Sequence, residues 1–215
     1  MKDLPQQRIT LEIFNYCNIN MTADFPPPNK HIDPSQLKGE NVFHASWKSS
    51  QLHGASLRLT SFQSCTFQTC DFSGVIFDMT SFTNCRFEEC KLSNLSFEEV
   101  LFKSCVFQYS LLKNTIFQSF ASGDKTKRKK TDLSSMVYTN CDLSDSVFMK
   151  CHCKGMKIQN SKLDGSVFEN CNLDGVDLTG TSIVGTRFDN CSIHGTKLDM
   201  NGFLQYGISK GFVLG

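Results

Sequence analysis

The stretch that decides the fold reads Ser61-Phe62-Gln63-Ser64-Cys65-Thr66-Phe67-Gln68-Thr69-Cys70-Asp71-Phe72. A phenylalanine returns at every fifth position, and a cysteine stands two places before each of the last two. A period of five residues matches neither the 3.6-residue period of a helix nor the two-residue period of a strand. It indicates a short unit that turns a corner every five residues. Four such units close one coil of about twenty residues, and successive coils stack into a solenoid.

The same register continues on both sides of this stretch. It holds at 17 positions from Leu37 to Phe117 and at 14 positions from Leu133 to Leu198, and all 31 positions are apolar if one Tyr and one Cys are counted. Only 40% of the chain is hydrophobic, so chance does not explain this agreement. The position two after each large residue is most often Gly or Asn, which tolerate the positive φ that tight corners need. We therefore predict an all-β rod of about eight coils with a strand spacing of ~4.8 Å.

The register divides the chain into five parts, which are an N-terminal cap with an irregular first coil (1–34), a first run of coils (35–118), a basic loop insertion (119–130), a second run of coils (131–200) and an apolar C-terminal cap (201–215). The break lies after Phe117, because the next large residue in register is Leu133 instead of the residue at position 122. The insertion has a net charge of +4, so we expect it to leave the rod. Its basic residues, which form a candidate partner-binding loop, are Lys125, Lys127, Arg128, Lys129 and Lys130.

The C-terminal tail is apolar and contains a single charge, Lys210. An open solenoid end exposes strand edges and needs a cover, which a cap alone would supply. A tail that also forms a dimer interface explains the excess of apolar surface better. The candidate dimerisation residues are Phe203, Leu204, Ile208, Phe212, Val213 and Leu214.

The eleven cysteines mostly follow the five-residue register, which favours interior packing in a reducing compartment such as the cytoplasm over disulfide bonds. In the tempting cluster Cys151-His152-Cys153, both cysteines point inward and the histidine outward, so we predict no metal site. The pairs Glu88-Glu89 and Glu98-Glu99 lie two corners apart and therefore on opposite sides. With no phosphate-binding loop and no nucleophile–histidine arrangement, we expect no enzyme, cofactor or small-molecule substrate. No apolar run is long enough to span a membrane.

The units Cys171-Asn172-Leu173-Asp174-Gly175 and Val176-Asp177-Leu178-Thr179-Gly180 resemble the A-(D/N)-L-x-x unit of the pentapeptide-repeat proteins. The resemblance covers roughly residues 35 to 200 and implies a right-handed quadrilateral β-helix with a short C-terminal cap. The repeat type, the length, the interrupting loop and the apolar ending are similar to the Qnr fluoroquinolone-resistance and albicidin-resistance type. That type implies a homodimer through the tail.

The same resemblance implies a partner, DNA gyrase or topoisomerase IV, which such rods bind partly by DNA mimicry and protect from quinolone-type inhibitors. Residues 131–200 carry six basic and nine acidic groups, whereas residues 35–118 carry seven of each. The candidate acidic face in the C-terminal half consists of Asp164, Glu169, Asp174, Asp177, Asp189 and Asp199. The alternative is a general protein–protein interaction scaffold, such as a bacterial effector or adaptor, with no topoisomerase role. In that case the Lys125–Lys130 run could be a nuclear-localisation patch or a solvated loop.

Overall fold

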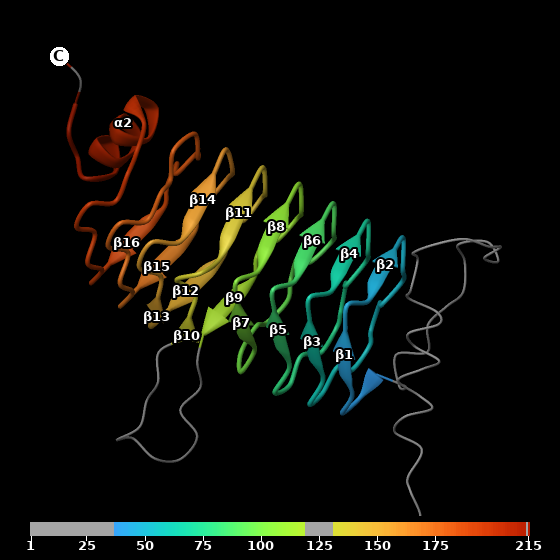
Figure 1. Cartoon of the computed structure of the whole chain (residues 1–215). Coiled ribbons are helices and arrows are strands. Elements are labelled where there is room, and N and C mark those ends of the chain that lie inside the picture. The colour runs from blue at the N-terminus through green and yellow to red at the C-terminus, as the bar shows by residue number, and fades with distance from the viewer. Residues whose placement is uncertain (1–36, 119–130, 214) are drawn as a thin grey trace, which may run out of the picture.

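The computed structural model describes residues 37–118, 131–213 and 215. These residues form a parallel β-solenoid of about seven turns that ends in one short helix (Figure 1). The sequence predicted about eight coils. Its 31 positions, at four per coil, make seven complete coils and three further positions. The predicted four-sided β-helix is thus confirmed, and strand partners such as Val42 and Phe62 lie one coil apart in the sequence.

We number the four sides of the rod in the order in which the chain passes through them. Side 1 is built from β1 (Asn41–Phe43), β3 (Ser61–Gln63), β5 (Ser81–Thr83), β7 (Leu101–Lys103), β10 (Thr131–Asp132) and β13 (Cys151–His152). Side 2 is built from β2 (Ser46–Lys48), β4 (Thr66–Gln68), β6 (Arg86–Glu88), β8 (Val106–Gln108), β11 (Val137–Thr139) and β14 (Lys157–Gln159). Side 3 is joined by single β-bridges from Gln51 to Ser182. Side 4 contains β9 (Ile116–Gln118), β12 (Val147–Met149), β15 (Val167–Glu169) and β16 (Arg187–Asp189), with bridges below them.

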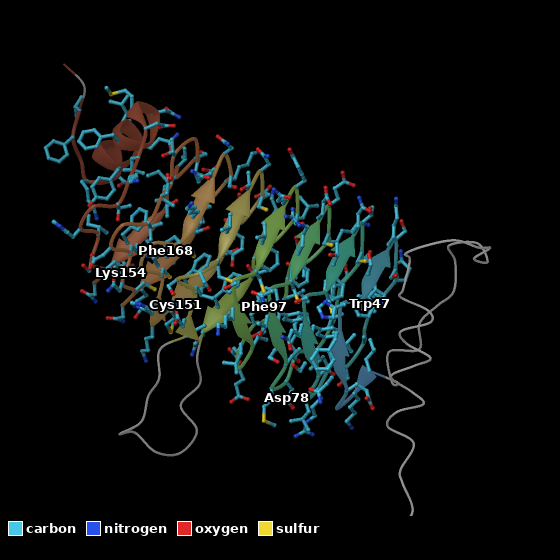
Figure 2. The ribbon with its side chains drawn as sticks, in the orientation of Figure 1. Trp47, Asp78, Phe97, Cys151, Lys154 and Phe168 are labelled. Atoms are coloured by element: carbon cyan, nitrogen blue, oxygen red, sulfur yellow. The ribbon has the colours of Figure 1, made fainter. Side chains whose placement is uncertain are left out.

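The large residues of the register fill the interior and stack from coil to coil. All but three of them are buried, and Figure 2 labels Trp47, Phe97 and Phe168 among them. The ring centroids of Phe87 and Phe107 lie 4.5 Å apart with nearly parallel planes. The exceptions occur in the last coil, where Ile193 is 41% exposed because no further coil covers it.

The small residues two places before each large residue also have a hydrogen-bonding role. The Thr60 hydroxyl donates to the carbonyl of Leu37 at 2.7 Å, and the Cys85 thiol donates to the carbonyl of Phe62 at 3.5 Å. All ten cysteines in the described part of the chain carry free thiols. Burial raises the pKa of Cys141 to about 11, which keeps this thiol protonated at neutral pH.

The corners adopt the positive φ that the Gly and Asn pattern predicts, for example at Gly54 and Asn94. The chain does not restrict itself to these two residue types, because Leu59, Thr69 and Met79 occupy corners at φ 59°, 55° and 49°. Non-glycine residues pay a steric penalty in this region, and a β-branched residue pays most.

The insertion interrupts the stacking without shifting its phase. Strand pairing continues directly across it, since Val106 pairs with Val137 and Ile116 pairs with Val147. These partners are further apart in the sequence than one ordinary coil, and the excess equals the break in the sequence register. The chain leaves the wall after Gln118 on side 4 and returns at Thr131 on side 1.

The helix α2 (Met200–Ser209) follows the last coil, although the five-residue spacing of Phe203 and Ile208 did not predict a helix. Asp199 is its N-cap and accepts a hydrogen bond from the Gly202 N–H at 2.8 Å. Tyr206 packs against Phe188, with ring centroids 6.0 Å apart. The helix therefore covers part of the open end of the rod. No helix in the described ranges is both long enough and apolar enough to cross a membrane.

Candidate partner-binding surfaces

The structure distributes the six candidate acidic residues over all four sides of the rod. Asp174 lies on side 1, Asp177 and Asp199 on side 2, Asp164 on side 3, and Glu169 and Asp189 on side 4. The six residues therefore do not share one face, because successive units of the register point in four directions. Their role in binding a partner stays a prediction.

Several of these carboxylates stabilise the corners of the rod. Asp164 accepts hydrogen bonds from the Ser182 hydroxyl at 2.5 Å and from the Val184 N–H at 3.0 Å. Asp174 does the same for the Ser192 hydroxyl and the His194 N–H in the next coil. The Ser192 hydrogen bond is the main cause that lowers the pKa of Asp174. These groups are therefore part of the framework as well as of the surface.

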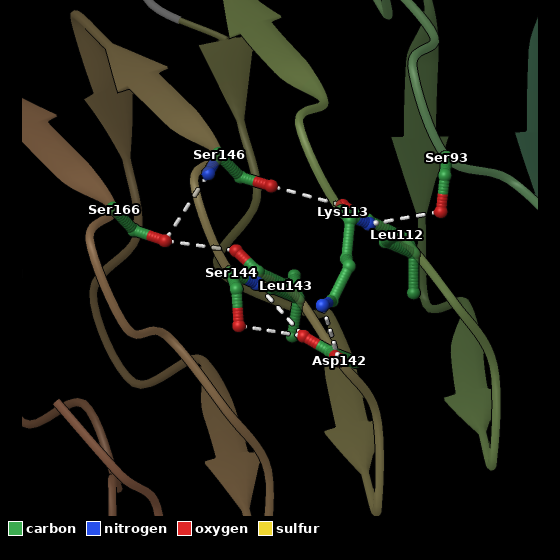
Figure 3. A network of polar contacts seen from close by, with 8 residues as sticks. All are labelled: Ser93, Leu112, Lys113, Asp142, Leu143, Ser144, Ser146 and Ser166. Carbon is green, nitrogen blue, oxygen red and sulfur yellow. Dashed lines mark hydrogen bonds and ion pairs between the residues drawn. The ribbon is translucent and has the colours of Figure 1, made fainter. Parts of the chain in front are cut away.

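Side 3 contains two ion pairs, each of which joins neighbouring coils. The Lys113 ammonium lies 3.4 Å from Asp142, which also accepts hydrogen bonds from the Ser144 N–H and hydroxyl (Figure 3). Burial raises the pKa of Asp142, but the Ser144 hydrogen bonds and Lys113 outweigh it and hold the pKa below its usual value. The pair Lys91–Asp71, 3.5 Å apart, lies lower on the same side. Lys162 and Asp145, higher on side 3, have no ion-pair partner among the described residues.

Side 4 carries a different pattern, of which the candidate acidic face contained only Glu169 and Asp189. One outer column contains the carboxylates of Asp78, Glu98, Glu169 and Asp189. Asp78 pairs with Arg58 at 2.8 Å and Asp189 with Arg187 at 3.7 Å, whereas Glu98 and Glu169 have no ion-pair partner among the described residues. The neighbouring outer column is largely apolar and contains Ile76, Ile116, Val147 and Val167. We call these two columns the side 4 surface.

Three other features predicted from the sequence have a definite place. Glu88 lies on side 2 and Glu98 on side 4, which confirms that the two glutamate pairs occupy opposite sides. Cys151 and Cys153 are buried and His152 is half-buried, as the register predicts. Within the described residues, no group of three His, Cys, Asp or Glu side chains is arranged to hold a metal ion.

The basic insertion lies outside the described residues, and so do Lys125, Lys127, Arg128, Lys129 and Lys130. Its two attachment points, Gln118 and Thr131, place its root at the edge between sides 4 and 1. This edge borders the side 4 surface.

The apolar residues of the C-terminal tail are mostly exposed in the single chain. Phe203 is 65% exposed and Val213 is 91% exposed, while Leu204 is half-buried and Leu214 lies outside the described residues. Ile208 and Phe212 are exposed as well. The tail thus presents an apolar surface of the kind that the dimer prediction requires.

The repeat is also recognised by comparison with known families. The profile "Pentapeptide repeat region" matches residues 129–198, and "Pentapeptide repeats (8 copies)" matches residues 80–118. Together they match just over half of the chain. The chain is a pentapeptide-repeat protein.

Solved structures of other pentapeptide-repeat proteins are similar to this chain. Full-length QnrB1, a plasmid-mediated fluoroquinolone resistance protein, is 21% identical; the match covers 85% of this chain and 93% of QnrB1, with a TM-score of 0.44. HetL, involved in heterocyst differentiation regulation in the cyanobacterium Nostoc, is 14% identical; the match covers 77% and 92% of the two chains, with a TM-score of 0.40. No curated protein sequence matches significantly.

Proposed function

We propose that this pentapeptide-repeat protein is a non-enzymatic rod that binds DNA gyrase or topoisomerase IV through the side 4 surface and modulates the effect of quinolone-type inhibitors. The supporting observation is the outer column of carboxylates at Asp78, Glu98, Glu169 and Asp189. These carboxylates form two pairs separated by Gln118 and Met149 in the same column, and such anionic groups are attracted to a protein surface built to bind DNA phosphates. The choice of enzyme rests on the resemblance of the sequence to the Qnr type.

The second candidate is a protein–protein interaction scaffold with no topoisomerase role. The ion pairs Arg58–Asp78 and Arg187–Asp189 support it, because they neutralise half of the side 4 carboxylates. The apolar column beside them also suits a protein surface better than it suits an imitation of DNA.

The test is a DNA supercoiling assay with gyrase, with and without a quinolone, titrated with this protein. The double variant Glu98→Gln/Glu169→Gln removes the two unpaired carboxylates of side 4. The matched control, Glu88→Gln/Glu89→Gln, removes the same charge from side 2 and the adjoining corner. We expect the wild type and the control to change supercoiling or protect it, and the side 4 variant to lose most of the effect. No effect of the wild type at large molar excess would leave the scaffold as the better reading.

We propose that the basic insertion contributes to the same binding without supporting the fold. Phe117 and Leu133 are separated by one five-residue unit plus eleven residues. Removal of residues 120–130 deletes these eleven residues and joins Ser119 to Thr131, so we expect the coils to rejoin in phase. Loop shortening changes closure entropy little, and the melting temperature should stay nearly constant. The clustered cations steer association and respond to salt, so partner binding should weaken. A deletion variant that protects gyrase as well as the wild type would contradict this role.

We further propose that the exposed tail joins two copies into a homodimer, since a two-fold contact buries the apolar side chains that one chain leaves in water.

A further inference from the structure

The wall of side 4 has a gap in its hydrogen-bond ladder, between the coil that contains Phe77 and the coil that contains Phe97. In the coil below, Leu57 and Leu59 donate their N–H groups to the carbonyls of Ile76 and Asp78 at 3.0 and 2.8 Å. In the coil above, Phe97 donates to Ile116 at 2.8 Å. The corresponding N–H groups of Phe77 and Met79 find no acceptor in the described part of the chain.

Two further amides mark the extent of this gap. The N–H groups of Gly74 and Ser96 also lack an acceptor in the described ranges, whereas their equivalents Gly54 and Ile116 donate to the neighbouring coil. Pairing is intact on both flanks, with the bridge Asp71↔Lys91 on side 3 and the β5–β7 pair on side 1. The gap therefore lies on side 4 between two paired flanks, and in the coil above only the Glu99 N–H likewise lacks an acceptor in the described ranges while Phe97 stays bonded.

The interior explains the gap. Side 4 normally places a small residue two positions before its large one, but Val75 and Leu95 occupy these places on either side of the gap. We attribute the gap to these larger side chains, since a close-packed interior cannot absorb extra methyl groups without a backbone shift.

Four large apolar side chains surround the gap on the outside. Ile76 is 62% exposed, Met79 51% and Leu101 72%, and Leu59 stacks one coil below Met79. Leu59 and Met79 occupy left-handed corners. Gly39, at the same corner one coil below Leu59, adopts this conformation without steric strain. Because left-handed corners with residues other than Gly occur throughout this rod, the exposure of these apolar side chains, and not their backbone conformation, points to a binding role. We call Leu59, Ile76, Met79 and Leu101 the apolar rim; Asp78, labelled in Figure 2, lies within it.

The charges next to the apolar rim indicate what it binds. Arg58 and Asp78 neutralise each other at 2.8 Å. Glu98 and Glu99 lie beside Met79 and Leu101, and neither has an ion-pair partner among the described residues. An apolar surface with two free carboxylates at its edge is complementary to a segment that carries apolar side chains next to Lys or Arg.

We propose that the apolar rim is a docking surface for an amphipathic basic segment of a partner protein. The apolar side chains of this segment cover Ile76, Met79 and Leu101, and its cations face Glu98 and Glu99. The loosened coil interface allows the two coils to adjust to the bound segment, because the missing ladder bonds lower the resistance to local movement. This inference goes beyond the proposed function, since it holds whether or not the partner is a topoisomerase.

The test uses the full-length protein and a synthetic helical peptide of Leu and Lys, with a Leu and Glu peptide of the same length as the reference. Binding is measured by fluorescence anisotropy and located by NMR of labelled methyl groups. We expect the Leu and Lys peptide to shift the methyl signals of Leu59, Ile76, Met79 and Leu101, and its affinity to fall with rising salt. The Leu and Glu peptide should bind at least about ten-fold more weakly.

The double variant Ile76→Ser/Met79→Asn tests the surface. Ser occurs at the position one coil below Ile76, at Ser56, and Asn occurs at another left-handed corner, at Asn94. Its matched control is Leu111→Ser/Tyr109→Asn, which removes an exposed apolar residue from a side and from a left-handed corner elsewhere on the rod. We expect the rim variant to lose about ten-fold or more in affinity and the control to bind like the wild type. Thermal melting of both variants verifies that they fold.

Three results would overturn the proposal. The first is that neither peptide binds, or that both bind equally well. The second is that the methyl shifts lie away from the apolar rim, or that the control variant loses as much affinity as the rim variant. The third is that another occupant holds the rim: analytical ultracentrifugation in which only the rim variant loses self-association would assign it to a second copy of this chain. NMR shifts of the rim methyls on deletion of residues 120–130 would assign it to the chain's own insertion.

Discussion

At the scale of single residues, the interior of this rod is held by two kinds of contact that repeat in every coil. Large rings stack directly on one another, as Phe148 does on Phe168 at 4.4 Å between centroids. Between them, hydroxyl and thiol groups donate to backbone carbonyls of the preceding coil, as Ser166 does to Leu143 at 2.8 Å. Cys, Ser and Thr at the small positions therefore fit the limited interior space and also donate hydrogen bonds to buried backbone carbonyls.

Replacement of Phe87 by Ala should destabilise the protein by ~3–5 kcal/mol, because the ring lies fully buried between Phe67 and Phe107 and rigid coils cannot collapse into the cavity. The midpoint of chemical denaturation measures this loss. An unchanged midpoint would be incompatible with a stacked core.

Replacement of Tyr138 by Phe should stabilise the protein by about 1 kcal/mol or more. The Tyr138 hydroxyl is fully buried and has no hydrogen-bond partner among the described residues, and its ring continues the stack above Phe107 at 5.0 Å. The substitution removes the desolvated hydroxyl and keeps the ring contact. A lower denaturation midpoint for this variant would show that the hydroxyl has a partner after all, such as a buried water.

At the scale of elements, the sides of the rod differ in how tightly the coils are joined. Side 2 is a continuous sheet of six strands, while side 4 has regular strands only from β9 onward. The difference follows the interior residues, because side 4 has Val75 and Leu95 below β9 and Thr115, Ser146 and Ser166 around and above it. Within side 4, regular strands therefore occur where the interior residue is Ser or Thr, whereas side 3 has only single bridges although its interior positions are small as well.

The gap in side 4 should be visible in hydrogen exchange, with the amides of Phe77 and Met79 exchanging faster than those of Leu57 and Leu59. Leu95→Thr should slow this exchange, because Thr fits the same place at position 115 and the smaller side chain lets the coils approach. The measurement is amide exchange of wild type and variant followed by NMR. If the folded Leu95→Thr variant shows unchanged exchange at the Phe77 and Met79 amides, Leu95 is not the cause of the gap.

The side 3 network should make stability depend on pH through Asp142. Its pKa in the folded protein is lowered, so its contribution is present above the unfolded pKa of ~3.9 and is lost as the pH falls through the folded value. Asp142→Asn should therefore cost on the order of 1 kcal/mol at pH 7, and the difference from wild type should shrink below about pH 4. Denaturation of both proteins between pH 3 and pH 8 checks this. A constant difference across the range would assign the cost to packing instead.

At the scale of the whole molecule, the last coil of the rod has an open edge that must be covered. At the C-terminal end, α2 places Tyr206 and Gln205 over the last coil, and Gln205 accepts a hydrogen bond from the Ile183 N–H at 2.7 Å. The outer surface of the tail remains apolar. A cap built in this way protects the edge of one chain and leaves a surface for a second one.

The full-length protein should be a dimer at micromolar concentration, as measured by light scattering coupled to size exclusion. Phe203→Ser/Phe212→Ser should give a monomer with little loss of stability, since both side chains are exposed in the single chain. Truncation after Leu198 should also give a monomer, but one that is less stable and prone to aggregate through its exposed edge. A wild type that is monomeric under these conditions would refute the dimer.

The sequence by itself determined the five-residue unit, the interior residues, the left-handed corners and the phase in which the coils resume after the insertion. These features are local or strictly periodic, so they can be read from the sequence alone. Only the tertiary structure decided that Asp164 and Asp174 stabilise corners and that the tail forms a helix. It also decided that the ladder opens at Phe77 and Met79. The physical reason is that outward residues from successive coils, far apart in the sequence, become neighbours when the coils pair. Whether two coils pair depends in turn on the combined volume of the interior residues that several coils contribute.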